Sequence, residues 1–368
     1  MTLLPSRGKS VVDRAERRVF LKQAACAAAI VSAPALALAA QPADEKPKKK
    51  ADMIWGDLLH LGMNMWCDRD VEHWGNLNAE EVTFVSARPY LRFDENLWKD
   101  LTRQMAGAGM NLVVIDLGEG VRYESHPELA VKGSWTPAKL REELAAVRKL
   151  GLEPIPKLNF STTHDAWLGP YSRCVSTPAY YRVCQDLIAE VVALFDKPRF
   201  FHLGYDEETA AHQVNYSYAV VRQHELWWHD FLFFVKQVET QGVRPWIWSD
   251  YGWHHKDEFF QKMPKSVLQS NWYYGLGFGA KLDPMVHHYL DLEEHGYDQI
   301  PTGSNWSTPK NFAATVEFCR QHISPAHLKG FLQTPWKPTV ELCRKHHLEA
   351  IDQVAQAIAA DAAPQHGK

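Results

Sequence analysis

Short apolar runs alternate with longer segments of helical periodicity from residue 59 onward. The runs have the length and continuous hydrophobicity of buried strands; they cover residues 59–65, 111–116, 153–158, 200–204, 244–248, 267–271, 299–303 and 329–334. Between several of them lie segments whose apolar positions recur every three or four residues, as on one face of a helix, at residues 97–109, 136–151, 177–195 and 308–322. Three of these segments open with Thr-Pro, which predicts an N-cap followed by the first helical position, at Thr136, Thr177 and Thr308.

Strands without polar alternation that are joined by helices indicate a parallel sheet covered on both faces. Eight such units in about 310 residues favour a (β/α)8 TIM barrel of the α/β class over a doubly wound sheet. A doubly wound nucleotide-binding sheet would carry a Gly-rich phosphate loop after an early strand, and the sequence has none. We therefore expect a single barrel domain over residues 53–362, followed by a short tail, 363–368.

The N-terminal segment resembles a Tat-type export signal. Arg17 and Arg18 precede a modest apolar run, and small residues suited to signal cleavage stand at 37–39. Pro34 interrupts the run, which is too short to span a bilayer comfortably. We expect residues 1–40 to be a signal peptide and 41–52 a disordered polar linker. The mature protein would then be periplasmic or secreted, with no stable membrane anchor; a retained anchor is the alternative.

Composition adds three observations to this picture. The net charge of −4 and the pI near 6.5 give no basic footprint for nucleic acid. Five cysteines follow the expected signal, so at least one thiol is free; neither they nor the paired histidines have metal-ligand spacing. We expect no metal and no cofactor. The 14 tryptophans are unusual, because indole rings serve either in cores or as plates against sugar faces.

Nearly every expected strand ends in an acid, an amide or a tryptophan. In a barrel, functional residues gather at these carboxyl ends. Polar groups set between aromatic plates are typical of a saccharide pocket. The strand ends carry Asn64, Trp66, Asp116, Glu119, Asn159, Asp206, Glu207, Trp248, Asp250, Asn271, Trp272, Asn305, Trp306 and Trp336.

Three consecutive acids follow the fourth strand in "FHLGYDEE", residues 201–208. Neighbouring residues at a strand end point in different directions, so Asp206 and Glu207 are expected to face a substrate with different roles. Glu208 is expected to open the following helix, where a carboxylate complements the helix dipole. His202 is expected to face the packed wall of the barrel or to support the acids.

Two segments resemble glycoside hydrolase family 20, the β-N-acetylhexosaminidase group. Residues 123–159 are similar to its second-to-third-strand region, and "LFDKPRFFHLGYDEE" (194–208) resembles its H-x-G-G-D-E signature. The resemblance extends over roughly residues 105–336. It implies a retaining, exo-acting hydrolase in which Glu207 is the general acid/base and Asp206 orients the substrate's 2-acetamido group. The acetamido oxygen, not an enzyme carboxylate, would then attack the anomeric carbon.

The chain departs from the family pattern at several positions. Tyr205 replaces a glycine, Lys157 and Asn159 replace a glutamate and an aspartate, and the arginine of the first strand is missing. His164 matches the family histidine after a one-residue slip. We expect an oligosaccharide or glycoside to be bound by Asp116, Arg122, Asn159, His164, Tyr205, Trp248, Asp250, Trp272, Tyr274, Trp306 and Trp336.

Two alternatives remain open. In the first, Glu207 works with Asp250 as nucleophile or base, on a sugar that has no acetamide. In the second, the barrel is an inactive periplasmic carbohydrate-binding protein that keeps the tryptophan rim. Asp116 and Arg122 either bind sugar hydroxyls or pair with each other.

Overall fold

The computed structural model describes residues 53–75, 77–279 and 281–362. The predicted signal peptide, linker and C-terminal tail lie outside the described residues. Eight parallel strands form one sheet in the order β6-β5-β4-β3-β2-β1-β8-β7. Their bounds are β1 Ile54–His60, β2 Leu112–Asp116, β3 Glu153–Lys157, β4 Phe200–His202, β5 Arg244–Trp248, β6 Leu268–Ser270, β7 Thr302–Gly303 and β8 Gly330–Gln333.

The barrel closes between β6 and β7 through short bridges. Gln269 pairs with Gln299 and Trp272 with Thr302, and the N–H of Ile300 donates to the carbonyl of Gln269 at 2.9 Å. The predicted α/β class and (β/α)8 barrel are confirmed.

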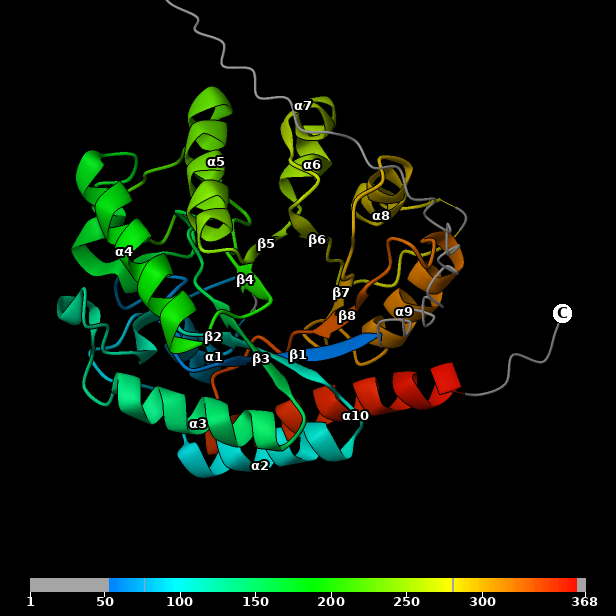
Figure 1. Cartoon of the computed structure of the whole chain (residues 1–368), viewed down its shortest axis with the longest axis horizontal. Coiled ribbons are helices and arrows are strands. Elements are labelled where there is room, and N and C mark those ends of the chain that lie inside the picture. Colours follow the sequence, from blue (N-terminus) through cyan, green and yellow to red (C-terminus); the bar gives the residue numbers. More distant parts are fainter. Residues whose placement is uncertain (1–52, 76, 280, 363–368) are drawn as a thin grey trace, which may run out of the picture. The chain divides into compact units, whose positions relative to one another are not determined.

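Helices surround the strands (Figure 1). An apolar core fills the inside of the barrel, with Leu58, Val114, Ile155, Trp246 and Leu332 among its members. A larger core lies between strands and helices. The helices are α1 Ala79–Val85, α2 Glu95–Gly107, α3 Pro137–Lys149, α4 Pro178–Leu194, α5 His224–Thr240, α6 Tyr251–His254, α7 Lys256–Lys262, α8 Pro284–Glu294, α9 Asn311–His322 and α10 Arg344–Ala362.

The first strand lies earlier than the sequence pattern predicts. β1 begins at Ile54 and ends at His60, whereas the apolar pattern placed it at 59–65. Gly56 and Asp57 interrupt the hydrophobic run, although Asp57 is completely buried. Asn64 and Trp66 therefore belong to the long loop that follows β1, not to the strand end.

The Thr-Pro pairs predict the N-cap residue correctly for two of the three helices. Thr136 and Thr177 cap α3 and α4 by accepting the backbone N–H of Lys139 and Tyr180. α9 instead begins at Asn311, with Lys310 as its N-cap residue and no side-chain cap. Thr308 and its proline belong to the preceding loop, which corrects the predicted start of that helix.

Five cysteines lie in the described part of the chain, and all are unpaired.

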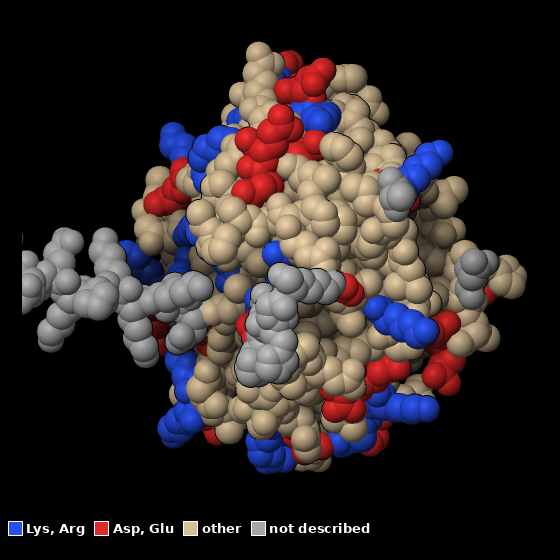
Figure 2. Space-filling model, turned by 90° about the vertical axis from the view of Figure 1, so that its right-hand side faces the viewer, with Lys and Arg blue, Asp and Glu red and all other residues tan. Residues whose placement is uncertain are grey.

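No helix within residues 53–362, apart from the two undescribed positions, is long and apolar enough to cross a membrane. On the face shown in Figure 2, basic and acidic side chains are interspersed around the edge.

Candidate active site

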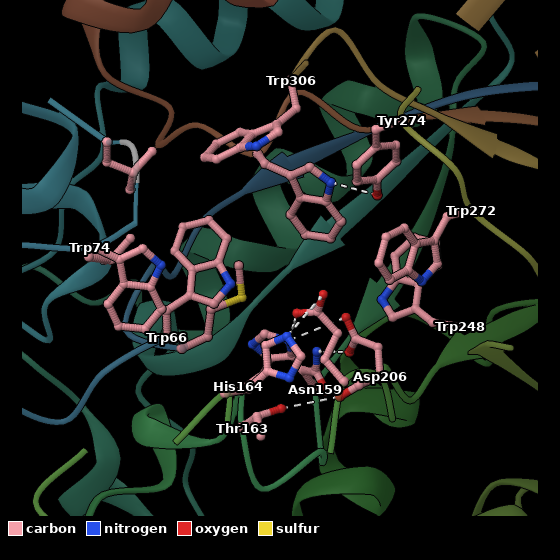
Figure 3. Close-up of a pocket in the computed structure, with 16 residues that line it drawn as sticks. Trp66, Trp74, Asn159, Thr163, His164, Asp206, Trp248, Trp272, Tyr274 and Trp306 are labelled. Atoms are coloured by element: carbon pink, nitrogen blue, oxygen red, sulfur yellow. Dashed lines mark hydrogen bonds and ion pairs between the residues drawn. The ribbon is translucent and has the colours of Figure 1, made fainter. Parts of the chain in front are cut away.

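A cavity of about 310 Å³ lies beside the carboxyl ends of the strands. In Figure 3, Trp66 and Trp74 lie on one side of it and Trp248 and Trp272 on the other, with His164 and Asp206 between them. The lining residues are Met65, Trp66, Trp74, Leu77, Val85, Asn159, Thr163, His164, Asp206, Glu207, His212, Trp248, Trp272, Tyr274, Trp306 and Trp336.

A tight turn after β4 presents the two acids. Gly204, Tyr205 and Glu207 have positive φ values of 68°, 76° and 54°, a conformation that is unfavourable for residues with a Cβ. Hydrogen bonds from neighbouring strands hold the turn. The N–H of Tyr205 donates to Asn159 Oδ1 at 3.1 Å, and the N–H of Glu207 donates to Asp250 Oδ2 at 2.9 Å. As a result Asp206 and Glu207 both reach the cavity.

Asp206 is an ionised carboxylate in a buried position. Asn159 Nδ2 donates to it at 2.8 Å, and His164 Nε2 lies 3.4 Å from Oδ2. Burial by itself would raise the pKa of Asp206. The positive charges of His164 and Lys157 and these hydrogen bonds outweigh burial, and hold the pKa well below its usual range.

His164 bridges the two acids. Its Nε2 lies 3.4 Å from Asp206 and 3.3 Å from Glu207 Oε2. Burial of the ring would lower the pKa of His164, but the charge of Asp206 and the contact with Glu207 raise it to about 10. The ring is therefore an imidazolium at neutral pH. The Glu207 side chain is 30% exposed, and His212 Nε2 lies 3.6 Å from its other oxygen.

The same three groups have the donor types of a divalent-cation site. His164, Asp206 and Glu207 each offer one ligand atom, and these atoms lie within 4.8 Å of one another. A metal would need His164 as a neutral imidazole. Without a metal, burial lowers the pKa of His164, but the charge of Asp206 and the contact with Glu207 outweigh burial and raise it to about 10, so the ring is then a protonated bridge between the acids.

Asp250 lies outside the cavity lining and holds the backbone of Glu207 in place. It follows β5 and is 8% exposed. One oxygen accepts the Glu207 N–H, and the other accepts the indole N–H of Trp272 at 3.4 Å. Burial, together with the charges of Asp206 and Glu207, raises the pKa of Asp250 to about 8. It is not among the described residues that line the cavity.

An aromatic wall faces the acids. Trp336 donates its indole N–H to the hydroxyl of Tyr274 at 2.8 Å. Tyr274 stacks on Trp272 with 5.0 Å between ring centroids, and Trp248 packs edge-on against Trp336 at 5.8 Å. These contacts fix the rings in place. The structure therefore brings together Asn159, His164, Asp206, Glu207, Trp248, Trp272, Tyr274, Trp306 and Trp336 from the predicted set.

Tyr205 lies outside the cavity, contrary to its predicted role in binding substrate. Its ring is buried against Trp227 and Phe231 of α5, with centroids 5.1 and 5.2 Å away. The guanidinium of Arg222 lies 4.7 Å from the ring centroid. The positive φ at residue 205 turns this side chain out of the barrel, toward the helical layer.

Asp116 and Arg122 also lie outside the cavity. Asp116 is buried at the end of β2, where it forms an ion pair with Lys157 and lies 3.5 Å from His60. Arg122 is exposed on the loop after β2. Asp116 and Arg122 neither line the cavity nor pair with each other, which corrects both expectations for them.

Glu208 does not open a helix. α5 begins at His224, and Glu208 is instead buried against Arg222, whose Nη2 and Nε donate to it at 2.7 and 2.8 Å. Arg222 also lies 3.3 Å from Asp230. This ion-pair cluster holds together the loop that follows the turn of Asp206 and Glu207. His202 faces the barrel interior, where its ring packs on Trp248 at 4.2 Å and its Nδ1 accepts the Gly204 N–H at 3.0 Å.

The segment between β1 and α2 supplies Met65, Trp66, Trp74, Leu77 and Val85 to the cavity. Of these, Trp66 belongs to the predicted rim of strand-end residues. Trp74, Leu77, Thr163 and His212 lie in irregular segments with no periodicity that would place them, whereas Val85 is the last residue of α1.

Neither the known protein-family models nor the curated protein sequences match this chain. Solved structures do match, and they share its fold. An exo-β-N-acetylglucosaminidase of glycoside hydrolase family 20 from Vibrio harveyi, in complex with N-acetylglucosamine, is 13% identical. It aligns over 86% of this chain and 55% of its own, with a TM-score of 0.55.

Two further structures match similarly. The β-N-acetylhexosaminidase of Bacteroides fragilis NCTC 9343 is 13% identical over 81% of this chain and 65% of its own, with a TM-score of 0.54. The N-acetyl-β-hexosaminidase of Streptomyces plicatus, in complex with Thio-NAglucal, is 14% identical over 83% and 64%, also with a TM-score of 0.54. The chain thus spans less than two thirds of the length of these proteins. The likeness establishes a barrel of the kind found in family 20 structures.

Proposed function

We propose that this chain is a glycoside hydrolase that releases a terminal N-acetylhexosamine with retention of configuration. The observation that carries the proposal is the pair Asp206–Glu207, bridged by the His164 imidazolium at the base of an aromatic cavity. The fold shared with family 20 enzymes and the "HLGYDEE" segment support the same activity.

In the first half of the proposed reaction, Glu207 donates a proton to the glycosidic oxygen. The acetamido oxygen attacks the anomeric carbon as the bond to the leaving group breaks, which forms a cyclic oxazolinium. Asp206 accepts a hydrogen bond from the acetamide N–H and compensates the positive charge that develops on it. His164 keeps Asp206 ionised and holds the Glu207 carboxyl toward the cavity.

In the second half, Glu207 removes a proton from water, and the water oxygen attacks the anomeric carbon and reopens the ring. Two inversions give net retention. Trp248, Trp272 and Trp336 would enclose the acetamide methyl group. The Tyr274 hydroxyl accepts the Trp336 N–H and lies 3.4 Å from Thr334 Oγ1. When substrate binds, it would turn its own proton from Thr334 to the acetamido oxygen.

The two-carboxylate alternative is less well supported. A nucleophile must reach the anomeric carbon, whereas the Asp250 oxygens accept the Glu207 N–H and the Trp272 indole N–H outside the cavity lining. With its pKa at about 8, Asp250 is also mainly a neutral acid at pH 7, which is a poor nucleophile.

We also propose export through a Tat-type signal, on the strength of Arg17, Arg18 and the apolar run that follows. Replacing both arginines by lysine should retain the full-length precursor inside the cell. N-terminal sequencing of the exported wild-type protein should show a new terminus near residue 40.

A panel of p-nitrophenyl β-glycosides, with and without the 2-acetamide, tests the activity. Hydrolysis confined to N-acetyl sugars, inhibition by a thiazoline analogue, and loss of activity in both Glu207→Gln and Asp206→Asn support the proposal. Cleavage of sugars that lack the acetamide, together with an inactive Asp250→Asn variant, supports the two-carboxylate mechanism instead. Sugar binding without cleavage of any glycoside would indicate a binding protein.

A further inference from the structure

Hydrogen-bonding groups are concentrated at the buried end of the cavity. Asn159, Thr163, His164 and Asp206 are between 1% and 7% exposed. Two of these are occupied within the protein: Asn159 contacts Asp206 and two backbone N–H groups, and the Thr163 hydroxyl contacts Ser161 and the Asp206 carbonyl. Groups directed at a ligand are therefore mainly Asp206, Glu207 and His164.

The outer part of the cavity has a different character. Trp306 is 39% exposed, and Trp66, Trp74 and Leu77 are partly exposed. We call these four residues the mouth. Among the described lining residues, the charged side chains besides histidine are Asp206 and Glu207. Beside the mouth, the Lys337 ammonium lies 4.9 Å from the centroid of the Trp306 ring and forms an ion pair with Glu81. His212 is the polar side chain at the rim.

Glu207, the proposed general acid, lies between the buried end of the cavity and the mouth. The Asp206 side chain is 10% exposed and that of Glu207 is 30% exposed. In a pocket closed at one end, the sugar that Asp206 orients occupies the buried part, and the leaving group extends past Glu207 toward solvent. The mouth residues are thus the ones that contact the leaving group.

We propose that the mouth binds an apolar, planar aglycone, so that the substrates are N-acetylhexosaminides of aromatic or similarly hydrophobic alcohols. This inference rests on the proposed function. A sugar in the same position would place several hydroxyls beside indole and leucine side chains. The polar side chains near them are His212 and Lys337, and Lys337 is already paired with Glu81, so hydroxyls that lose water there without gaining a partner are unfavourable. An aromatic ring there would instead bury apolar area and stack on Trp74 or Trp306.

Two alkyl glycosides with similar leaving groups isolate the contribution of the mouth. We expect kcat/KM for the 2-phenylethyl β-N-acetylglucosaminide to exceed that of the methyl glycoside by at least about tenfold, the gain expected from burying a phenyl ring. Trp74→Ala and Leu77→Asn should bring this ratio toward one. Inhibition by a thiazoline, which fills the sugar part alone, should change less than about twofold in these variants. Leu342→Asn, at a leucine that is 64% exposed and does not line the cavity, is the matched control.

The proposal is overturned if wild type treats the two alkyl glycosides alike, if a chitobiose-type disaccharide is clearly the better substrate, or if the mouth variants slow both glycosides equally. If wild type cleaves none of them, it is the proposed function that fails. Binding of the matching 2-phenylethyl and methyl 1-thioglycosides then decides the role of the mouth. A preference for the phenylethyl compound that Leu77→Asn removes supports an apolar aglycone site, and equal dissociation constants contradict it.

Discussion

The backbone N–H of Glu207 donates a hydrogen bond to the Asp250 carboxyl group at 2.9 Å. Residue 207 has a φ of 54°, so this contact from the end of β5 stabilises an otherwise unfavourable conformation. A side chain that follows β5 thereby sets the direction of the acid that follows the neighbouring strand, β4. Asp250 is a positioning residue in this account.

Replacing Asp250 therefore tests whether it positions Glu207 or acts as the nucleophile. Asp250→Ala removes the acceptor and should lower kcat by about 10- to 100-fold, as expected for loss of one or two buried hydrogen bonds. Asp250→Asn keeps an acceptor oxygen and should stay within about fivefold of wild type. If Asp250→Asn is as inactive as Glu207→Gln, and azide rescues Asp250→Ala, then Asp250 is the nucleophile.

The adjacent acids Glu207 and Glu208 should affect different properties. Glu208→Gln breaks the buried pair with Arg222 and should destabilise the fold by about 3–5 kcal/mol, measured by denaturant unfolding. Its kcat, corrected for folded fraction, should change little. Glu207→Gln should lower kcat by about 10²–10⁴-fold and should lower the unfolding free energy much less than Glu208→Gln does. An active Glu207→Gln variant would remove Glu207 from the mechanism.

The raised pKa of His164 predicts how the stability of the folded protein depends on pH. Because its pKa rises from an unfolded value of about 6.5 to about 10 in the folded protein, its contribution is complete below about pH 6.5. The contribution declines as pH rises and is lost once pH passes the folded pKa. Asp206 behaves oppositely: its pKa is depressed, so its contribution is present above its unfolded pKa and is lost in acid. The Tm difference between wild type and His164→Asn should therefore be large at pH 6 and small above pH 10. A difference that does not vary with pH would contradict an imidazolium bridge.

Tyr274 should act through its hydroxyl. Tyr274→Phe leaves the Trp336 indole N–H without its acceptor and removes the proposed donor to the acetamide. We expect a loss of about tenfold or more in kcat/KM, as for one catalytic-site hydrogen bond. Tyr273→Phe, at the neighbouring phenol that does not line the cavity, is the control. Equal effects of the two substitutions would indicate a general disturbance of the loop.

The barrel and most of the cavity were predictable because they follow from local signals. Apolar runs mark buried strands, and strand ends meet at one face of a barrel, so Asn159, Asp206, Trp248 and Trp336 converge as their positions indicate. Strand β1 was displaced in the prediction because the buried Asp57 resembles a loop residue in sequence.

The errors arise where side-chain direction depends on the backbone. Tyr205 follows the strand signal, but its φ of 76° turns the ring toward α5. Asp116 was expected to meet a ligand, but the neighbouring strand supplies Lys157 as its partner. Trp74 and Leu77 come from an irregular loop, whose path depends on tertiary contacts that sequence periodicity does not encode.

The most direct test of the central claim is the dependence of rate on the nucleophilicity of the substrate's own acetamide. We would measure kcat/KM for p-nitrophenyl N-acetyl-β-glucosaminide and for its N-fluoroacetyl, N-difluoroacetyl and N-trifluoroacetyl analogues. If the acetamido oxygen attacks the anomeric carbon, the rate should fall steeply with each fluorine, and Asp206→Asn should lower the rate for the parent compound. A rate that is insensitive to fluorination, in an enzyme that retains Glu207 as its acid, would contradict substrate-assisted catalysis.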